Sequence, residues 1–190
     1  MIVILQSTTY GVDQHLFGHT LQELITFGLQ ENLTQLVKSS KLFSRRQFAC
    51  RIDRRTFVVG PATPAQRALF GVARATEDAV FEALRPGVAV ADLYPTAEAV
   101  VARGAPPHFP AGSLVLPGFV GHGIGLELDE PPVLWPRDDA RLQAGMVLAI
   151  EVEVSAPGQG TMVKLEDTVV VQPDGCELLT ATPRELIECD

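Results

Sequence analysis

Two long apolar segments, GMVLAIEVEV (145–154) and TMVKLEDTVVV (161–171), are separated only by SAPGQG. Both segments are rich in strand-forming residues, and the linker contains proline and glycine, so they predict an antiparallel hairpin. With a two-residue loop centred on Gly158-Gln159, the numbers of paired residues add to 317. Because 151 and 166 also add to 317, Glu151 is predicted to lie opposite Glu166 on one face.

A carboxylate pair in this position needs a charge partner. Directly opposed residues have Cβ atoms about 5 Å apart, so buried carboxylates there must share a proton, meet a cation or hold a metal. Divalent metals bind carboxylate oxygens, and the borderline ones add an imidazole, which His122 in GHGIGL (121–126) can supply. The alternative is that both glutamates face solvent, or that a longer loop changes the register.

Three segments in order, GHGIGL, GMVLAIE (145–151) and LEDTVVV (165–171), resemble the carboxy-terminal half of the pita-bread metallopeptidases. This family includes methionine aminopeptidases, Xaa-Pro aminopeptidases and prolidases, and RTFVVGPATPAQ (55–66) resembles the preceding strand and helix start in Xaa-Pro members. The resemblance implies an α+β pita-bread fold, best matched in its carboxy-terminal half and incomplete in its amino-terminal half.

The resemblance also implies a metal site. In the family, two metal ions are held by two aspartates, one histidine and two glutamates, and a water between the ions is the nucleophile. His122, Glu151 and Glu166 match the histidine and the two glutamates of this site. The implied cofactor is a divalent metal, Mn, Co or Zn.

The two aspartates of that site are matched less well. The first lies in a D-x-G motif, which is not found upstream in this sequence. The second lies in D-x-T-R-T, where this chain has Ile52-Asp53-Arg54-Arg55-Thr56. Aligning Arg55-Thr56 with R-T places Ile52 at the ligand position, so Asp53 is a candidate metal ligand only with a one-residue gap.

Asp129 stands where peptidase members have a second histidine, which the family uses near the scissile group. An imidazole can donate a hydrogen bond to a developing oxyanion, whereas an ionised carboxylate only accepts hydrogen bonds and repels negative charge. Asp129 is therefore a candidate catalytic residue whose chemistry argues against ordinary peptide hydrolysis. The alternative is a loop residue that accepts backbone N–H bonds beside Glu130-Pro131-Pro132.

Three other histidines have weaker patterns. His108, in APPHFPAG, resembles a histidine that lines the substrate site in some relatives, and the alternative is an exposed loop residue. His15 and His19 are spaced so that both fall on one face of a possible helix. No acidic residue lies between them as in HExxH, which favours an ordinary polar helix face.

Along the chain, residues 1–48 are predicted to be a helical segment, with one or two helices over 12–40, and residues 49–190 a pita-bread-like domain. Residues 48–60 predict a strand. Thr63, Pro64 and Gln66 form the pattern of a capping box, so a helix is expected from about Pro64 to the stop at 85–87. A second helix is expected over about 94–103.

Composition excludes several classes of function. The 190 residues are 46% hydrophobic and 20% charged, the balance of an ordinary globular domain. The net charge of -8 opposes binding to nucleic acid, and no apolar run of membrane-spanning length is present, so a cytoplasmic protein is expected. Three cysteines without a CxxC pair indicate neither a disulfide framework nor a structural zinc site.

These patterns favour a metal-dependent hydrolase of the Xaa-Pro peptidase type, acting on a small peptide or amide and impaired by its missing ligands. One alternative is a non-catalytic binding module with the same fold. A second alternative is a metal-free amide hydrolase similar to creatinase. An incomplete amino-terminal half would expose sheet edges, which predicts a homodimer.

Overall fold

The predicted hairpin lies inside the sheet of this computed structural model. Strands β5 (Val147–Ala156) and β6 (Thr161–Gln172) are antiparallel, and Glu151 pairs with Glu166, as predicted. The loop is longer than the predicted two residues: it spans 157–160 and contains the 3-10 turn η2 (Pro157–Gln159). Because both loops are centred between residues 158 and 159, the register is unchanged.

The structure describes residues 2–10, 50–127 and 129–189, and within these residues eight strands form one sheet. The main strand order is β1-β2-β6-β5-β3-β4, while β7 pairs with β6 and β8 pairs with β2. The remaining strand bounds are β1 (Ile2–Tyr10), β2 (Cys50–Val59), β3 (Gly121–Gly123), β4 (Glu130–Val133), β7 (Gly175–Leu178) and β8 (Ile187–Cys189).

Two outcomes concern the amino-terminal half of the chain. The strand predicted over 48–60 is β2. The segment 1–48, predicted as helical, begins instead with strand β1. The helices predicted over 12–40, together with His15 and His19, lie outside the described residues.

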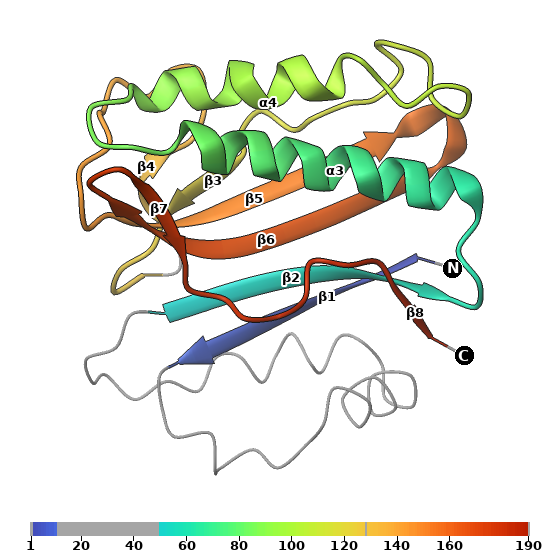
Figure 1. Cartoon of the computed structure of the whole chain (residues 1–190), viewed down its shortest axis with the longest axis horizontal. Coiled ribbons are helices and arrows are strands. Elements are labelled where there is room, and N and C mark those ends of the chain that lie inside the picture. Colours follow the sequence, from blue (N-terminus) through green and yellow to red (C-terminus); the bar gives the residue numbers. More distant parts are fainter. Residues whose placement is uncertain (1, 11–49, 128, 190) are drawn as a thin grey trace. The chain divides into compact units, whose positions relative to one another are not determined.

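The predicted capping box starts helix α3 (Pro64–Ala83). Thr63 Oγ1 accepts a hydrogen bond from the Gln66 backbone N–H at 3.2 Å, and Gln66 Oε1 accepts one from the Thr63 N–H at 2.8 Å. The second predicted helix is α4 (Leu93–Val101), preceded by the 3-10 turn η1 (Val90–Asp92). Both helices cover the same face of the sheet (Figure 1).

Alternation along the hairpin separates an apolar face from a polar one. The side chains that pack into the core beneath the helices are Leu148, Ile150, Val152 and Val154 of β5 and Val163, Leu165, Val169 and Val171 of β6. Glu151, Glu153, Lys164 and Glu166 occupy the intervening positions, so they lie on the opposite face. Among the described residues, no helix combines the length and hydropathy needed to cross a bilayer.

Candidate metal centre

Strand pairing brings together three residues that are far apart in the sequence. His122 on β3 pairs with Ala149 of β5, so Glu151, two residues further along β5, lies on the same face as His122. Glu166 pairs with Glu151 and completes the group. One ligand atom of each residue lies within 4.8 Å of the others, and all three residues are buried.

The glycines on either side of His122 allow neighbouring strands to approach closely. A Cβ atom at Gly123 would lie 2.5 Å from the Pro131 carbonyl oxygen, and one at Gly121 would overlap the Ala149 carbonyl oxygen. A side chain at either position would therefore push β3 away from its neighbours. The GHG sequence fixes the backbone that carries the His122 ring.

The His122 ring is oriented by its own strand. Its Nδ1 lies 2.9 Å from the Gly123 carbonyl oxygen, which can only accept, so Nδ1 donates and Nε2 faces the cluster. Nε2 is 3.7 Å from Glu151 Oε2 and 3.0 Å from Asp129 Oδ1. Asp129, whose side chain is 73% exposed, therefore lies beside His122 at the rim of the centre.

Arg54 on β2 lies between the two glutamates. It pairs with Glu166, and its Nη1 donates to Glu151 Oε1 at 2.8 Å. Its Nε is 2.9 Å from Glu166 Oε2, but these two buried atoms lack the alignment of a hydrogen bond. The contact with Glu166 is therefore an ion pair, and one guanidinium contacts both carboxylates.

Lys164 adds a second positive charge. Its Nζ contacts Glu151 Oε1 and lies 3.6 Å from Glu153 Oε2. Burial raises the pKa of Glu166 to about 7, an effect that Arg54 and Lys164 oppose and the neighbouring Glu151 charge reinforces. The carboxylates of the centre are thus partly neutralised by the chain's own cations.

This residue set fits one divalent cation. An imidazole nitrogen with two carboxylate oxygens is a typical ligand set for Mn, Co or Zn. In the part of the chain that the structure describes, this is the only group of three or more such side chains close enough to hold an ion. In the chain as it stands, a second ion would have to share the carboxylate oxygens that Arg54 and Lys164 already contact.

Asp53, predicted as a further ligand, is not brought to the cluster. Adjacent strand residues point to opposite faces, and Arg54 faces Glu166, so Asp53 faces away from the centre. Ile52 lies on the side of the centre, where its backbone N and O are 2.8 and 2.9 Å from Thr168 Oγ1. Ile52, which the ungapped alignment places at the ligand position, therefore lies on the face of the centre, and Asp53 does not.

His108, predicted to line a substrate site, lies in the loop between α4 and β3. Its carbonyl oxygen accepts a hydrogen bond from Gln159 Nε2 at 3.3 Å, in the loop that closes the hairpin. Glu151 is five residues before the end of β5, about 17 Å along the strand from that loop. The structure does not bring His108 to the cluster.

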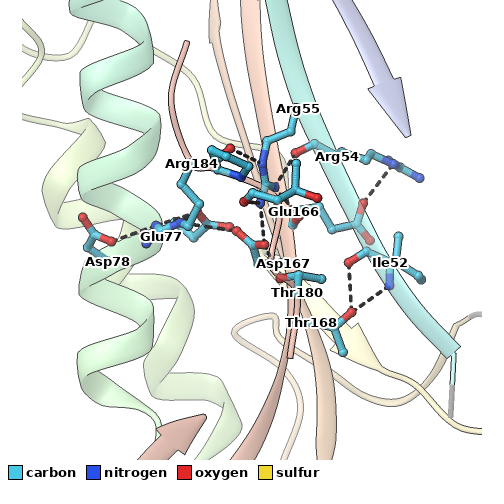
Figure 2. Close-up of polar contacts among 12 residues, drawn as sticks. Ile52, Arg54, Arg55, Glu77, Asp78, Glu166, Asp167, Thr168, Thr180 and Arg184 are labelled. Carbon is cyan, nitrogen blue, oxygen red and sulfur yellow. Dashed lines mark hydrogen bonds and ion pairs between the residues drawn. The ribbon is translucent and has the colours of Figure 1, made fainter. Parts of the chain in front are cut away.

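A second charged cluster lies between the sheet and α3 (Figure 2). Arg55 Nη2 donates to Asp167 Oδ1 at 2.7 Å, and Arg184 Nη2 donates to Glu77 Oε2 at 2.7 Å. Burial raises the pKa of Glu77 to about 8, the charge of Asp167 acts in the same direction, and Arg184 opposes both. This cluster joins α3 and the segment after β7 to the sheet.

Sequence reasoning missed most of these charged partners. Lys164 could have been found, because the predicted register places it on the same face as Glu151 and Glu166. The register also places Asp167 opposite Ile150, in a row of core residues. Arg54 depends on the pairing of β2 with β6, more than a hundred residues apart in the sequence, for which no local signal exists.

Fold and site together define an α+β domain with a buried histidine and two glutamates placed so that they could hold a divalent ion. The model of metallopeptidase family M24 matches residues 49–173. The putative dipeptidase YkvY of Bacillus subtilis strain 168 is 35% identical over 138 residues, which are 73% of this chain and 36% of that protein. The Xaa-Pro dipeptidase of Pyrococcus furiosus is 33% identical over 133 residues, 70% of this chain and 36% of that protein.

Solved structures agree with these relatives. A dipeptidase from Pyrococcus horikoshii OT3 has a TM-score of 0.64 at 28% identity, and the match covers 74% of this chain and 37% of that one. The chain therefore belongs to metallopeptidase family M24 and has the α+β pita-bread architecture of its relatives. The matched part of the chain spans about 36% of the length of each of these two curated relatives.

Proposed function

We propose that this chain is a metal-dependent hydrolase domain that acts on a small peptide or amide. The observation that carries the proposal is the buried group of His122, Glu151 and Glu166, with ligand atoms within 4.8 Å of one another. Its relatives include proteins named Xaa-Pro dipeptidase, so a dipeptide ending in proline is the first substrate to test.

A divalent ion bound here would polarise the substrate carbonyl and lower the pKa of a bound water. The chain's own groups define the rest of the chemistry. His122 is held by its Nδ1 bond to Gly123, so Nε2 faces the cluster without a change of rotamer. Asp129 is exposed beside that nitrogen and can accept a proton, but as a carboxylate it cannot donate to an oxyanion.

The lack of a hydrogen-bond donor at Asp129 sets the expected level of activity. Removal of one oxyanion donor lowers kcat by about a hundred-fold to a thousand-fold in well-studied hydrolases. We therefore expect slow hydrolysis of peptides, with amides that have better leaving groups turned over faster.

The second candidate is a non-catalytic binding module of the same fold. The observation that favours it is the contact of Arg54 with both glutamates and of Lys164 with Glu151, which neutralises the carboxylates without a metal. A fold that hosts an enzyme can keep its architecture after its chemistry is lost.

Metal content and dipeptide hydrolysis distinguish the two candidates. Purified protein would be analysed for metal, titrated with Mn, Co and Zn, and assayed with Xaa-Pro dipeptides, alongside Glu151→Gln and Glu166→Gln. The matched control is Glu153→Gln, a carboxylate on the same strand face outside the ligand group. We expect one ion per chain and hydrolysis in the wild type and the control, and the loss of both in the other variants.

A lack of metal binding would contradict the proposed hydrolase function. If the wild type binds no metal under any of these conditions, and both variants unfold at the same temperature as the wild type, the hydrolase proposal is wrong. The binding module then becomes the leading function.

A further inference from the structure

Arg54 lies where a cation shared by Glu151 and Glu166 would lie. Its Nη1 reaches Glu151 Oε1, and its Nε reaches Glu166 Oε2, at 2.8 and 2.9 Å. The Arg54 side chain is 23% exposed, and the two carboxylates are buried. A fixed, permanently charged group thus fills one side of the carboxylate pair.

The other side of the pair remains turned towards His122. Glu151 uses Oε1 for Arg54 and Lys164, while its Oε2 lies 3.7 Å from His122 Nε2. The two oxygens of Glu151 therefore face two different cation positions, as do those of a carboxylate shared between the ions of a two-metal site. In this chain a guanidinium occupies one of these positions.

The sequence of β2 is consistent with a guanidinium in the place of a metal ion. Where the motif D-x-T-R-T has aspartate and threonine, this chain has Ile52 and Arg54. Both residues lie on the side of the centre, since they alternate along a strand whose Arg54 faces Glu166. Losing one anion and gaining one cation changes the local charge by +2, the charge of one divalent ion.

We propose that Arg54 is the second cation of the centre: its guanidinium holds one oxygen each of Glu151 and Glu166, and one metal position remains beside His122. The inference rests on the proposed function, in which the centre binds a metal. A guanidinium supplies charge and orients both carboxylates, but unlike a metal it cannot activate water. Arg54 is thus a positioning residue that sets both the number of ions and the affinity for the remaining one.

Isothermal titration calorimetry with Mn²⁺ on the chelator-treated 190-residue chain tests the proposal. The variants are Arg54→Met, which keeps the length of the side chain without its charge, and the control Arg67→Met, which removes an arginine from the exposed ion pair with Glu188. We expect one ion per wild-type chain. In R54M, freeing the carboxylates should raise the affinity at least about tenfold or admit a second ion, and R67M should match the wild type.

A stability measurement accompanies the titration. In chelator, R54M leaves two buried carboxylates without their bridging cation, so its Tm should fall, and Mn²⁺ should raise it by more than it raises the wild-type Tm. If R54M does not fold, Arg54→Lys keeps the charge but not the fork that contacts both carboxylates. R54K should then bind Mn²⁺ more tightly than the wild type.

The outcomes separate this inference from the function on which it rests. One ion in the wild type, with the same number and affinity in the folded Arg54 variant, overturns the role of Arg54 and leaves the metal-dependent hydrolase intact. No ion in either protein overturns the hydrolase and the inference with it. No ion in the wild type but one in the Arg54 variant also overturns the inference, because Arg54 would then exclude metal entirely.

Discussion

Adjacent residues on β2 and on β6 belong to two charged clusters on opposite faces of the sheet. Glu166 and Asp167 are neighbours on β6, and Arg54 and Arg55 are neighbours on β2. Because strand residues alternate, Arg54 meets Glu166 on one face and Arg55 meets Asp167 on the other. A one-residue shift of β2 would place each arginine on the wrong side, so the two ion pairs specify the same register.

The cluster beneath α3 makes stability depend on pH. Burial raises the pKa of Glu77 from 4.5 to about 8, and the pKa of Asp167 is raised in the same direction. Between pH 4.5 and pH 8 the folded chain binds more protons than the unfolded chain. The contribution of Glu77 to the free energy of unfolding is therefore complete below pH 4.5 and is lost as the pH rises through 8. Glu77 alone should contribute a slope of up to about 1.4 kcal/mol per pH unit.

Urea denaturation of Glu77→Gln at several pH values between 5 and 9 tests this origin. Gln cannot titrate, so the free energy of unfolding of the variant should fall less steeply with pH than that of the wild type. Glu82→Gln, a change at an exposed position of the same helix, should keep the wild-type slope. Equal slopes in wild type and E77Q would show that Glu77 is already ionised in the folded chain.

At the scale of elements, the sequence predicted those features of the fold that depend on residues close together in the chain. The Glu151–Glu166 pairing followed from two strands joined by a short loop, and α3 followed from a capping box. The predicted loop was two residues too short, yet the register survived because it depends only on the centre of the loop. The group of His122, Glu151 and Glu166 could be predicted because the hairpin register pairs the two glutamates, and because the three motifs that contain these residues occur in the order seen in the family.

Other features depended on contacts between distant segments. The pairing of β2 with β6 decides the face on which Arg54 lies. The charge partner of Glu77 is Arg184, more than a hundred residues later in the sequence. Alternation within β2 predicts only that Asp53 and Arg54 face opposite sides, not which of them faces the centre. The ambiguous alignment of Asp53 could therefore be resolved only by the sheet itself.

Strand β3 gives a prediction at this scale. In Gly123→Ala the new Cβ would lie 2.5 Å from a backbone oxygen of β4, and backbone cannot rotate aside as a side chain can. We expect a loss of stability of about 1–3 kcal/mol, typical of overpacking, and weaker Mn²⁺ binding because His122 moves with β3. Gly118→Ala, where a Cβ meets open space, should change neither the urea midpoint nor the titration. Unchanged metal binding in G123A would show that β4 moves instead of β3.

At the scale of the molecule, apolar side chains gather near one edge of the sheet. β4 is the last strand in the main strand order. Val133 on β4 and Trp135 just after it are 36% and 39% exposed, and Leu126, in the loop before β4, is 96% exposed. Large apolar side chains close to an edge strand are typical of surfaces that associate, while Pro131 and Pro132 cannot donate ladder hydrogen bonds to a further strand.

These features lead us to predict a homodimer that associates through side chains near β4 rather than through a continuous sheet. Size-exclusion chromatography with light scattering should give twice the chain mass of 20.5 kDa. Leu126→Asp should shift the protein to the monomer, because it introduces a charge into an apolar contact, whereas Val115→Asp, at another exposed apolar position, should leave the mass unchanged. A monodisperse wild-type monomer at the concentrations used for metal titration would contradict the dimer. A dimer that persists in L126D would place the interface on another surface.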